Sequence, residues 1–364
     1  MQSSRRSRAG KGRSKRSHGG GGKALPKDAG SRRLTGRTGH SGSYKAEYAA
    51  GFAEAAAILR NGAAPLAGHE AKLLMNEHWT RRSLQGALRS GSQQQRGMAF
   101  ADGFAAGLRL PGGMWVPVAL TRSAAAVVMA GPNARLESVQ QLLRLPLDEI
   151  VIVQEAAGGE AFNRFRALPD VTIIHTREKL GMDVGRTVGA RLTNAELVLF
   201  VDGEAAVSAE QLAVLLAEAQ AGSDLVLADV SGRLGAFRGW SDAARIQAFM
   251  NWSLGKPELQ ANSVAVLPHA WSRPAMERVG LPLLAVPPMA HRAAIEHQLR
   301  IRCFPVAAAS PAALGTGSMG PADAAKLSAG DHIEALRAAM RTKGARLSLP
   351  DGVRRRLAAG RSAT

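Results

Sequence analysis

Glu196-Leu-Val-Leu-Phe-Val-Asp202-Gly-Glu204 is the last of three short apolar runs in this sequence. The other two are Ala124-Ala-Ala-Val-Val-Met-Ala130 and Glu149-Ile-Val-Ile-Val153. Each run is apolar on both alternating faces, which is typical of parallel strands covered by helices on both sides. Arg135–Leu145 and Gly181–Leu192 lie between the runs and are long enough for crossover helices. We therefore predict a doubly wound α/β unit, although any single run also fits a buried helix segment.

Small and polar residues follow each run where the predicted strand ends. They are Gly131-Pro-Asn133, Gln154-Glu155 and Asp202-Gly-Glu204. Ligands of open α/β sheets bind beyond the carboxyl ends of the strands, so these residues should share one edge of the sheet. Two carboxylates one residue apart suit a divalent cation that carries a diphosphate, because hard cations prefer oxygen ligands. Such a pair is also typical of an ordinary turn or a helix cap.

The order of these pieces resembles the nucleotide-binding half of family 2 glycosyltransferases of the GT-A type. In that family a first strand ends near an Asn, a D-E-I strand ends in two Asp, a G-x-x-x-A-R-N-x-G helix follows, and an apolar strand closes on D-x-D. This chain offers Asn133, the Asp148–Val153 run, the Gly181–Gly189 segment and Asp202-Gly-Glu204. The resemblance implies a GT-A (Rossmann-like) fold, with a mixed, mostly parallel sheet flanked by helices.

The resemblance also implies roles for particular residues. Asp202 and Glu204 would hold a divalent cation, Mn²⁺ or Mg²⁺. The nucleotide-sugar donor would contact five residues: Asn133, Gln154, Glu155, Arg186 and Asp202. The implied activity is the transfer of a hexose from that donor to a hydroxyl of a glycan, lipid or protein acceptor.

Several positions depart from the family pattern. Gln154-Glu155 stands where the family has two Asp, Thr187 replaces the Asn of the helix motif, and Glu204 replaces the second Asp of the metal motif. Arg273–Gly280 resembles the acceptor-side segment R-x-x-[FL]-x-x-[IV]-G. However, the Glu-Asp pair that commonly follows it, whose Asp is the catalytic base, is absent. A non-catalytic GT-A-fold binding or scaffold protein therefore stays open as the alternative, and so does the question of enzymatic activity.

A helix predicted over Met289–Arg302 carries two other candidates for the base. His291 and Glu296 both lie on it, and either side chain can accept a proton from an acceptor hydroxyl. A histidine on a surface helix is more often structural or solvated than catalytic.

The N-terminal 43 residues are rich in Arg, Lys, Ser and Gly. Within residues 1–40, 12 Lys and Arg oppose Asp28 alone, a net charge of +11 out of +18 for the chain. Because almost nothing apolar is present to bury, we expect this tail to be disordered. It is either a solvated tail or an arm that binds RNA or another nucleic acid, anionic lipid, or an anionic polymer such as an acidic wall polymer, through contacts that weaken with salt.

Four regions are predicted along the chain: the disordered basic tail (1–43), a helical extension (44–113), a GT-A-like domain (114–310), and a C-terminal loop, helix and basic end (311–364). In the extension, Tyr48-Ala-Ala-Gly-Phe52 and Phe100-Ala-Asp-Gly-Phe104 are related pieces. Small residues beside an aromatic suit close contact between helices, so we expect two or three packed helices there.

Further elements are predicted after Glu204. They are a helix over Ser208–Gln220, a strand over Asp224–Ala228, a helix over Trp240–Trp252, a strand over Asn262–Leu267, and a last helix that begins at Asp331. The last helix should dock through its apolar residues Ile333, Leu336 and Met340.

The cysteine content and the lengths of the apolar runs indicate the cellular compartment of the protein. The single cysteine, Cys303, excludes an intramolecular disulfide and favours a reducing compartment. No apolar run approaches the roughly 18–20 residues that span a bilayer. We therefore expect a cytoplasmic protein without a transmembrane segment, at most peripheral to a membrane.

Overall fold

The computed structural model describes residues 44–61, 68–85, 92–155, 159–178, 180–307 and 321–349. The predicted tail, residues 1–43, lies outside the described residues, as does the basic end from residue 350 onward. The prediction that the tail is disordered therefore stays a prediction.

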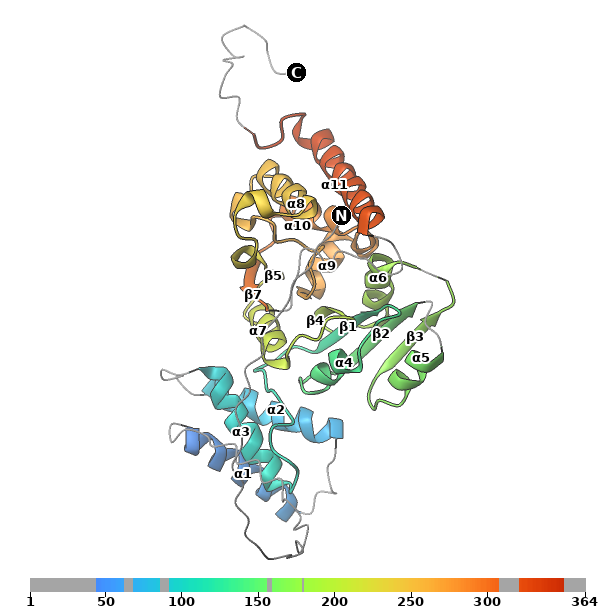
Figure 1. The fold of residues 1–364 in the computed structure, drawn as a ribbon. Helices are drawn as coiled ribbons and strands as arrows, with labels where there is room; N and C mark the ends of the chain where they lie inside the picture. Colours follow the sequence, from blue (N-terminus) through green and yellow to red (C-terminus); the bar gives the residue numbers. More distant parts are fainter. Residues whose placement is uncertain are drawn as a thin grey trace, which may run out of the picture. The chain divides into compact units, whose positions relative to one another are not determined.

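A seven-stranded sheet lies at the centre of the described chain, in the order β3-β2-β1-β4-β6-β5-β7 (Figure 1). Its strands are β1 (Ala124–Ala130), β2 (Glu149–Glu155), β3 (Thr172–Thr176), β4 (Leu197–Asp202), β5 (Leu225–Asp229), β6 (His269–Ser272) and β7 (Ile301–Pro305). The pairs β1–β2, β1–β4, β2–β3 and β5–β7 are parallel, whereas β6 runs antiparallel to β4 and β5. The predicted mixed, mostly parallel sheet is confirmed.

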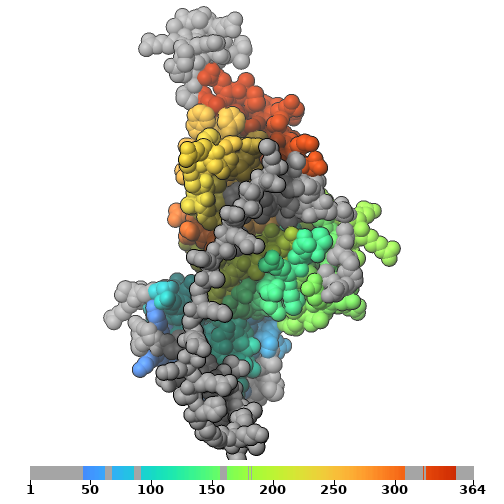
Figure 2. Space-filling view, viewed as in Figure 1, coloured from blue at the N-terminus to red at the C-terminus, as the bar shows by residue number. Residues whose placement is uncertain are grey.

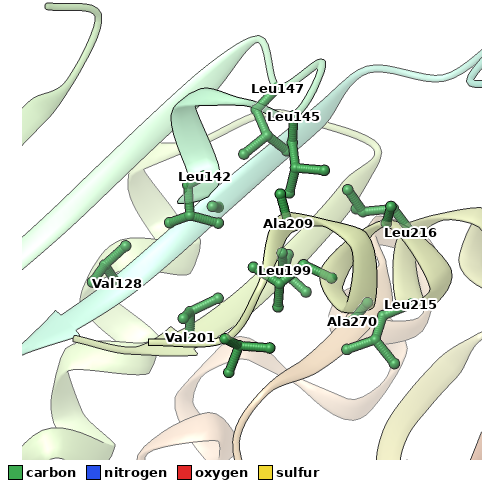
Figure 3. Packing of buried hydrophobic residues seen from close by; sticks show 14 of the residues in the cluster. Val128, Leu142, Leu145, Leu147, Leu199, Val201, Ala209, Leu215, Leu216 and Ala270 are labelled. Atoms are coloured by element: carbon green, nitrogen blue, oxygen red, sulfur yellow. The ribbon is translucent and has the colours of Figure 1, made fainter. Parts of the chain in front are cut away.

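Helices cover both faces of this sheet. One face is covered by α4 (Leu136–Leu143), α5 (Gly159–Arg166) and α7 (Ala209–Gln220). The other is covered by α6 (Met182–Leu192), α9 (Arg273–Val279) and α10 (Pro287–Glu296). Figure 3 shows the first layer, in which Leu142 of α4 and Leu215 of α7 pack toward Val128 and Leu199 of the sheet. Burial of apolar side chains on both faces explains why the strands lack a polar face.

Three helices precede the sheet: α1 (Lys45–Arg60), α2 (Gly68–Gln85) and α3 (Gln93–Gly107). They share a core that includes Phe100 and Phe104. Helices α1 and α3 approach so closely that a Cβ on Gly51 would lie 2.1 Å from the Phe100 carbonyl oxygen. A Cβ on Gly103 would likewise lie 2.0 Å from the Tyr48 carbonyl oxygen. The two related sequence pieces therefore meet each other, glycine against backbone, as the prediction of close helix contact requires.

A polar stripe on α2 joins these helices to the sheet domain. Lys72 Nζ donates to the Leu143 carbonyl at 3.1 Å. One turn later Asn76 Oδ1 accepts from the Val118 amide at 3.0 Å, and Thr80 Oγ1 accepts from the Leu120 amide at 3.2 Å. Burial lowers the pKa of Lys72 to about 8. Spacing of four residues places all three side chains on one face of the helix, so the contact is made by directional hydrogen bonds.

The strand predicted over Asn262–Leu267 is wrong, because those residues form turns and the returning strand is β6. Polar groups of this segment form hydrogen bonds with residues outside it. The side chain of Asn262 accepts from the Val230 amide at 2.8 Å, and the carbonyls of Val264 and Ala265 accept from a buried arginine, Arg186. With those groups engaged, the sheet ladder forms only after residue 268.

The helix predicted over Met289–Arg302 is too long. Helix α10 ends at Glu296, Gln298 adopts a positive φ of 55°, and Ile301 and Arg302 belong to β7. A left-handed residue cannot continue a right-handed helix, so the chain turns there and adds a strand beside β5.

The last helix begins earlier than predicted. Helix α11 (Pro321–Lys343) starts at a proline, a favoured first position, and Asp331 lies in its middle. It packs with α8 (Asp242–Ser253) and α10 through Ala335 and Ala339, whereas Ile333 and Met340 are exposed. Small residues permit the close approach. Leu336 packs against the same core, so the prediction holds for Leu336 and is wrong for Ile333 and Met340. None of the helices in the described part of the chain is long and apolar enough to span a membrane.

Candidate functional site

The turn Asp202-Gly203-Glu204 leaves the carboxyl end of β4 and is held by backbone contacts. The Gly203 amide donates to the Met129 carbonyl at 2.8 Å, and the Glu204 amide donates to Asp202 Oδ1 at 2.8 Å. The Gly203 carbonyl accepts from the Arg135 amide at 2.8 Å and from Ser138 Oγ at 3.0 Å. A Cβ on Gly203 would lie 2.8 Å from the Met129 oxygen, so the turn needs glycine. The two carboxylates are therefore fixed at the end of a central strand.

The electrostatic environment disfavours two negative charges in this turn. Burial raises the pKa of Asp202, and the Glu204 amide and the Arg186 charge offset this only in part. Burial, and then the charge of Asp202, raise the pKa of Glu204. Hydrogen bonds from Asn133 lower this pKa but do not cancel the increase. Glu204 Oε1 is buried and has no hydrogen-bond partner. An uncompensated carboxylate pair of this kind fits a hard divalent cation, which would supply the missing positive charge.

Alternation along the strands separates the predicted donor residues. Asp202 continues the face of β4 that carries Phe200, and Glu155 continues the face of β2 that carries Val153; both faces pack against the α6 side. Gln154 points to the opposite face, where its side chain is fully buried and neither polar atom has a partner. The structure therefore brings Asp202 and Glu155 to one side of the sheet and does not bring Gln154 there.

Arg186, on α6, is 2% exposed and lies within electrostatic range of Asp202. Its guanidinium donates to the carbonyls of Val264, at 2.7 Å, and Ala265, at 3.3 Å, and lies 3.3 Å from an Asp183 carboxylate oxygen. Burial lowers the pKa of Arg186, while Asp183 and Asp202 raise it. Arg186 thus supplies positive charge near Asp202 while its NH groups hold the loop after α8.

A small apolar crevice of about 10 Å³ lies between the ends of β1 and β2 and the start of α6. Met129, Val153 and Gly185 line it, and Glu155 lies at its rim. Glu155 Oε2 accepts from the Gly181 amide at 2.6 Å. The carboxylate therefore ties the end of β2 to the first turn of α6, beside the apolar space.

The two predicted base candidates lie in a different environment. His291 is fully buried, and its Nε2 donates to Asn251 Oδ1 at 2.7 Å. Burial lowers the pKa of His291 to about 3, with a further contribution from His332. Glu296 forms an ion pair with Arg292 one turn away on α10. Among the described residues no hydrogen bond or ion pair links His291 or Glu296 to Asp202, so the environment favours a packing role for His291.

Buried His291 should make the protein sensitive to mild acid. Its folded pKa of about 3 lies below the ordinary 6.5, so the unfolded chain takes up the proton first and stability falls as pH falls through this window. Between about pH 7 and pH 5 the loss should be about 2 kcal/mol from this one group.

The measurement is urea unfolding across that pH range. His291→Gln should flatten the dependence on pH, whatever its effect on the stability at neutral pH. His297→Gln, a change at the partly exposed end of α10, should leave the dependence as steep as in the parent. An unchanged slope for His291→Gln would contradict the prediction.

Three residues near the turn, Arg135, Ser138 and His269, were not predicted from the sequence, whereas Gly131 was among the residues predicted at the end of the first strand. Gly131 lies under Glu204, since a Cβ there would be 2.6 Å from Glu204 Oε1, and Ser138 and Arg135 hold the Gly203 carbonyl. His269 is buried within electrostatic range of Arg186. Burial, and then the charge of Arg186, lower the pKa of His269 well below its usual value. The Gly-Pro-Asn sequence after β1 was a usable indication for Gly131, whereas nothing in the sequence marks His269.

Comparison with known proteins identifies part of the chain. Residues 134–278 match the family model described as glycosyl transferase family 2. This segment is a family 2 glycosyltransferase domain. The matched residues of the family 2 domain include Asp202, Glu204 and Arg186, whereas Asn133, His291 and Glu296 lie outside them. None of the curated proteins matches the chain.

Solved structures similar to this chain include glucosyl-3-phosphoglycerate synthase from Mycobacterium tuberculosis. Its complex with Mn²⁺, UDP and phosphoglyceric acid is 14% identical, with a TM-score of 0.46, over 73% of this chain and 86% of that one. The complex with Mn²⁺ and UDP-glucose is 15% identical, with a TM-score of 0.45, over 64% and 81%. The complex with Mg²⁺ and UDP is 15% identical, with a TM-score of 0.44, over 64% and 82%.

Proposed function

We propose that the family 2 domain transfers a sugar from a nucleotide-sugar donor to an acceptor hydroxyl, with Mn²⁺ or Mg²⁺ held by Asp202 and Glu204. The observation that carries the proposal is the carboxylate pair, rigidly placed at the end of β4 with both pKa values raised and Glu204 Oε1 unpartnered. A bound cation would stabilise the negative charge of the leaving diphosphate.

The surrounding residues take distinct parts in this proposal. Asn133 is exposed at the end of β1 and donates to Glu204, so its amide orients that carboxylate and can also reach the donor. Glu155 would accept from a base or ribose hydroxyl at the crevice. Arg186 is a positioning residue, because its charge favours the ionised form of Asp202 against the effect of burial while its NH groups fix the neighbouring loop. Gln154 is assigned a packing role on the opposite face.

A second function, a non-catalytic GT-A-fold binding or scaffold protein, is favoured by one specific observation. Glu204 folds back against Gly131 and Asn133, and Asp202 Oδ1 already accepts the Glu204 amide. In that case the turn would be a structural cap that needs no cation. A third function, binding of RNA or another anionic polymer by the tail, concerns residues outside the described part of the chain.

Calorimetry with the full chain distinguishes the first two functions. UDP and other nucleoside diphosphates are titrated with and without Mn²⁺ near neutral pH. We expect a saturable signal that requires the metal, and a rise in unfolding free energy of about 2.7 kcal/mol when the ligand is present at 100 times its dissociation constant. Lower pH should weaken binding, because protons compete for both carboxylates. The absence of a signal for every nucleotide would contradict the proposed enzymatic function and favour the scaffold function.

A further inference from the structure

Four aromatic side chains gather on the outside of α8 and the turn before it. Phe237 lies in the short 3-10 helix η3 (Phe237–Gly239) and is 62% exposed, with its ring 5.2 Å from that of Trp240. Phe249 and Trp252 of α8 are 47% and 53% exposed, with their rings 6.5 Å apart. We call Phe237, Trp240, Phe249 and Trp252 the aromatic patch. So much exposed aromatic surface in one place marks an interaction site.

The fold holds this patch rigidly outward. The side chain of Ser241 accepts from the Ala244 amide and caps α8, and Trp240 Nε1 donates to the Gly235 carbonyl at 3.1 Å. The inner face of α8 is already used, since Met250 packs in a core with residues of α10 and α11. The aromatic patch therefore lies on a second face of the same helix, away from this core, and Figure 2 shows the α8 segment, coloured yellow, at the surface of the molecule.

One arginine contacts the aromatic patch, and two more lie in the segment before α8. The Arg245 guanidinium lies 5.6 Å from the centre of the Phe237 ring, donates to the Arg238 carbonyl at 2.9 Å and pairs with Asp242 at 3.0 Å. Arg233 and Arg238 lie on the adjoining turn. Residues 233–252 thus hold three arginines against Asp242 alone, and the patch has a positive rim.

We propose that the aromatic patch binds the surface of an anionic lipid bilayer. Amphipathic aromatic rings prefer the headgroup level of a membrane, and arginine beside them is attracted by anionic lipids. The positive rim favours this partner over a neutral apolar one. The patch adjoins the turn that follows β5, and β5 runs in the same direction as β4 because both are antiparallel to β6. A bound membrane would therefore lie toward the edge of the sheet that carries Asp202.

Quenching of tryptophan fluorescence by brominated lipids tests this proposal on the full chain. Trp79, Trp115 and Trp271 are buried, so Trp240 and Trp252 are the tryptophans that bromine can reach. The basic tail contains no tryptophan, so binding through the tail alone gives no quenching. We expect quenching by brominated vesicles of phosphatidylcholine with phosphatidylglycerol, and about 10-fold weaker binding for Phe237→Ser with Phe249→Ser, because partitioning scales with the apolar area that is buried.

Two further variants make the test decisive. Phe52→Ser with Leu327→Ser removes two similarly exposed apolar side chains elsewhere and should leave quenching unchanged. Arg238→Glu keeps every aromatic ring and should weaken binding to the anionic vesicles. Co-sedimentation with vesicles but no quenching would overturn the proposal and assign binding to the tail. Equal quenching by pure phosphatidylcholine would overturn the anionic preference, and self-association without quenching would identify the patch as a protein interface.

Discussion

Changing Asp202 to Asn should lower the affinity for UDP in the presence of Mn²⁺ by about 100-fold or more, because one of the two proposed cation ligands loses its charge. Asn keeps an oxygen that can accept the Glu204 amide, so the turn itself should persist. Above its raised pKa, the ionised Asp202 costs stability, so in the absence of metal the variant should unfold no more easily than the parent. Calorimetry and urea unfolding measure the two effects.

The control lies at the other end of the same strand. Glu196 immediately precedes β4, and its carboxylate accepts from the Ser123 amide at 3.3 Å. Glu196→Gln should leave nucleotide binding unchanged, because the carboxyl and amino ends of β4 lie at opposite edges of the sheet. If Asp202→Asn instead unfolds readily while the parent binds no nucleotide, Asp202 is a structural cap and the scaffold function stands.

Changing Gly103 to Ala should destabilise the packing of α1 on α3 by about 3 kcal/mol. An overpacked contact is costly when it can be relieved only by moving the backbone. The added methyl group would lie 2.0 Å from the Tyr48 carbonyl oxygen, so the helices have to separate. The same argument applies to Gly51→Ala, which meets the Phe100 carbonyl at 2.1 Å. Urea unfolding, followed by helical circular dichroism, measures the loss.

Gly330→Ala is the matched control, since Gly330 lies within α11 and nothing is within 4 Å of the added Cβ. It should raise stability by about 0.5–1 kcal/mol, the ordinary advantage of Ala over Gly inside a helix. If Gly103→Ala also raises stability, the close approach of α1 and α3 is not a packing constraint.

The central strands could be predicted because a strand buried on both faces needs an unbroken apolar run, and three such runs are present. Because these runs are apolar on both faces, the sequence does not indicate which face of the sheet each residue lies on. Gln154 was therefore grouped with Glu155, although successive residues of a strand point to opposite faces. The position of Asp202 and Glu204 at the carboxyl end of β4 could be predicted, because an apolar run that ends in polar residues marks where a buried strand stops.

The C-terminal elements were harder to predict because their packing depends on small and polar residues. Helix α11 docks through Ala335 and Ala339, with the predicted Leu336 beside them, and the two alanines form no apolar pattern strong enough to outweigh the exposed Ile333 and Met340. The burial of His291 follows from that docking, so its environment could not be read from its own helix. The hydrogen bonds that hold the segment after α8 likewise depend on Arg186, which is far away in sequence.

The position of Arg186 would link movement of the loop after α8 to binding of the proposed cation at Asp202. Its guanidinium is shared between the carbonyls of Val264 and Ala265 and the charge of Asp202, and burial prevents water from replacing either. If the loop carrying those carbonyls moved away, the guanidinium would lose two acceptors and keep only Asp183 and the charge of Asp202, so it would compete with the proposed cation for Asp202. Loop position and the affinity for the proposed cation would then be linked equilibria, and by reciprocity a bound cation would favour the loop position in which Arg186 donates to Val264 and Ala265.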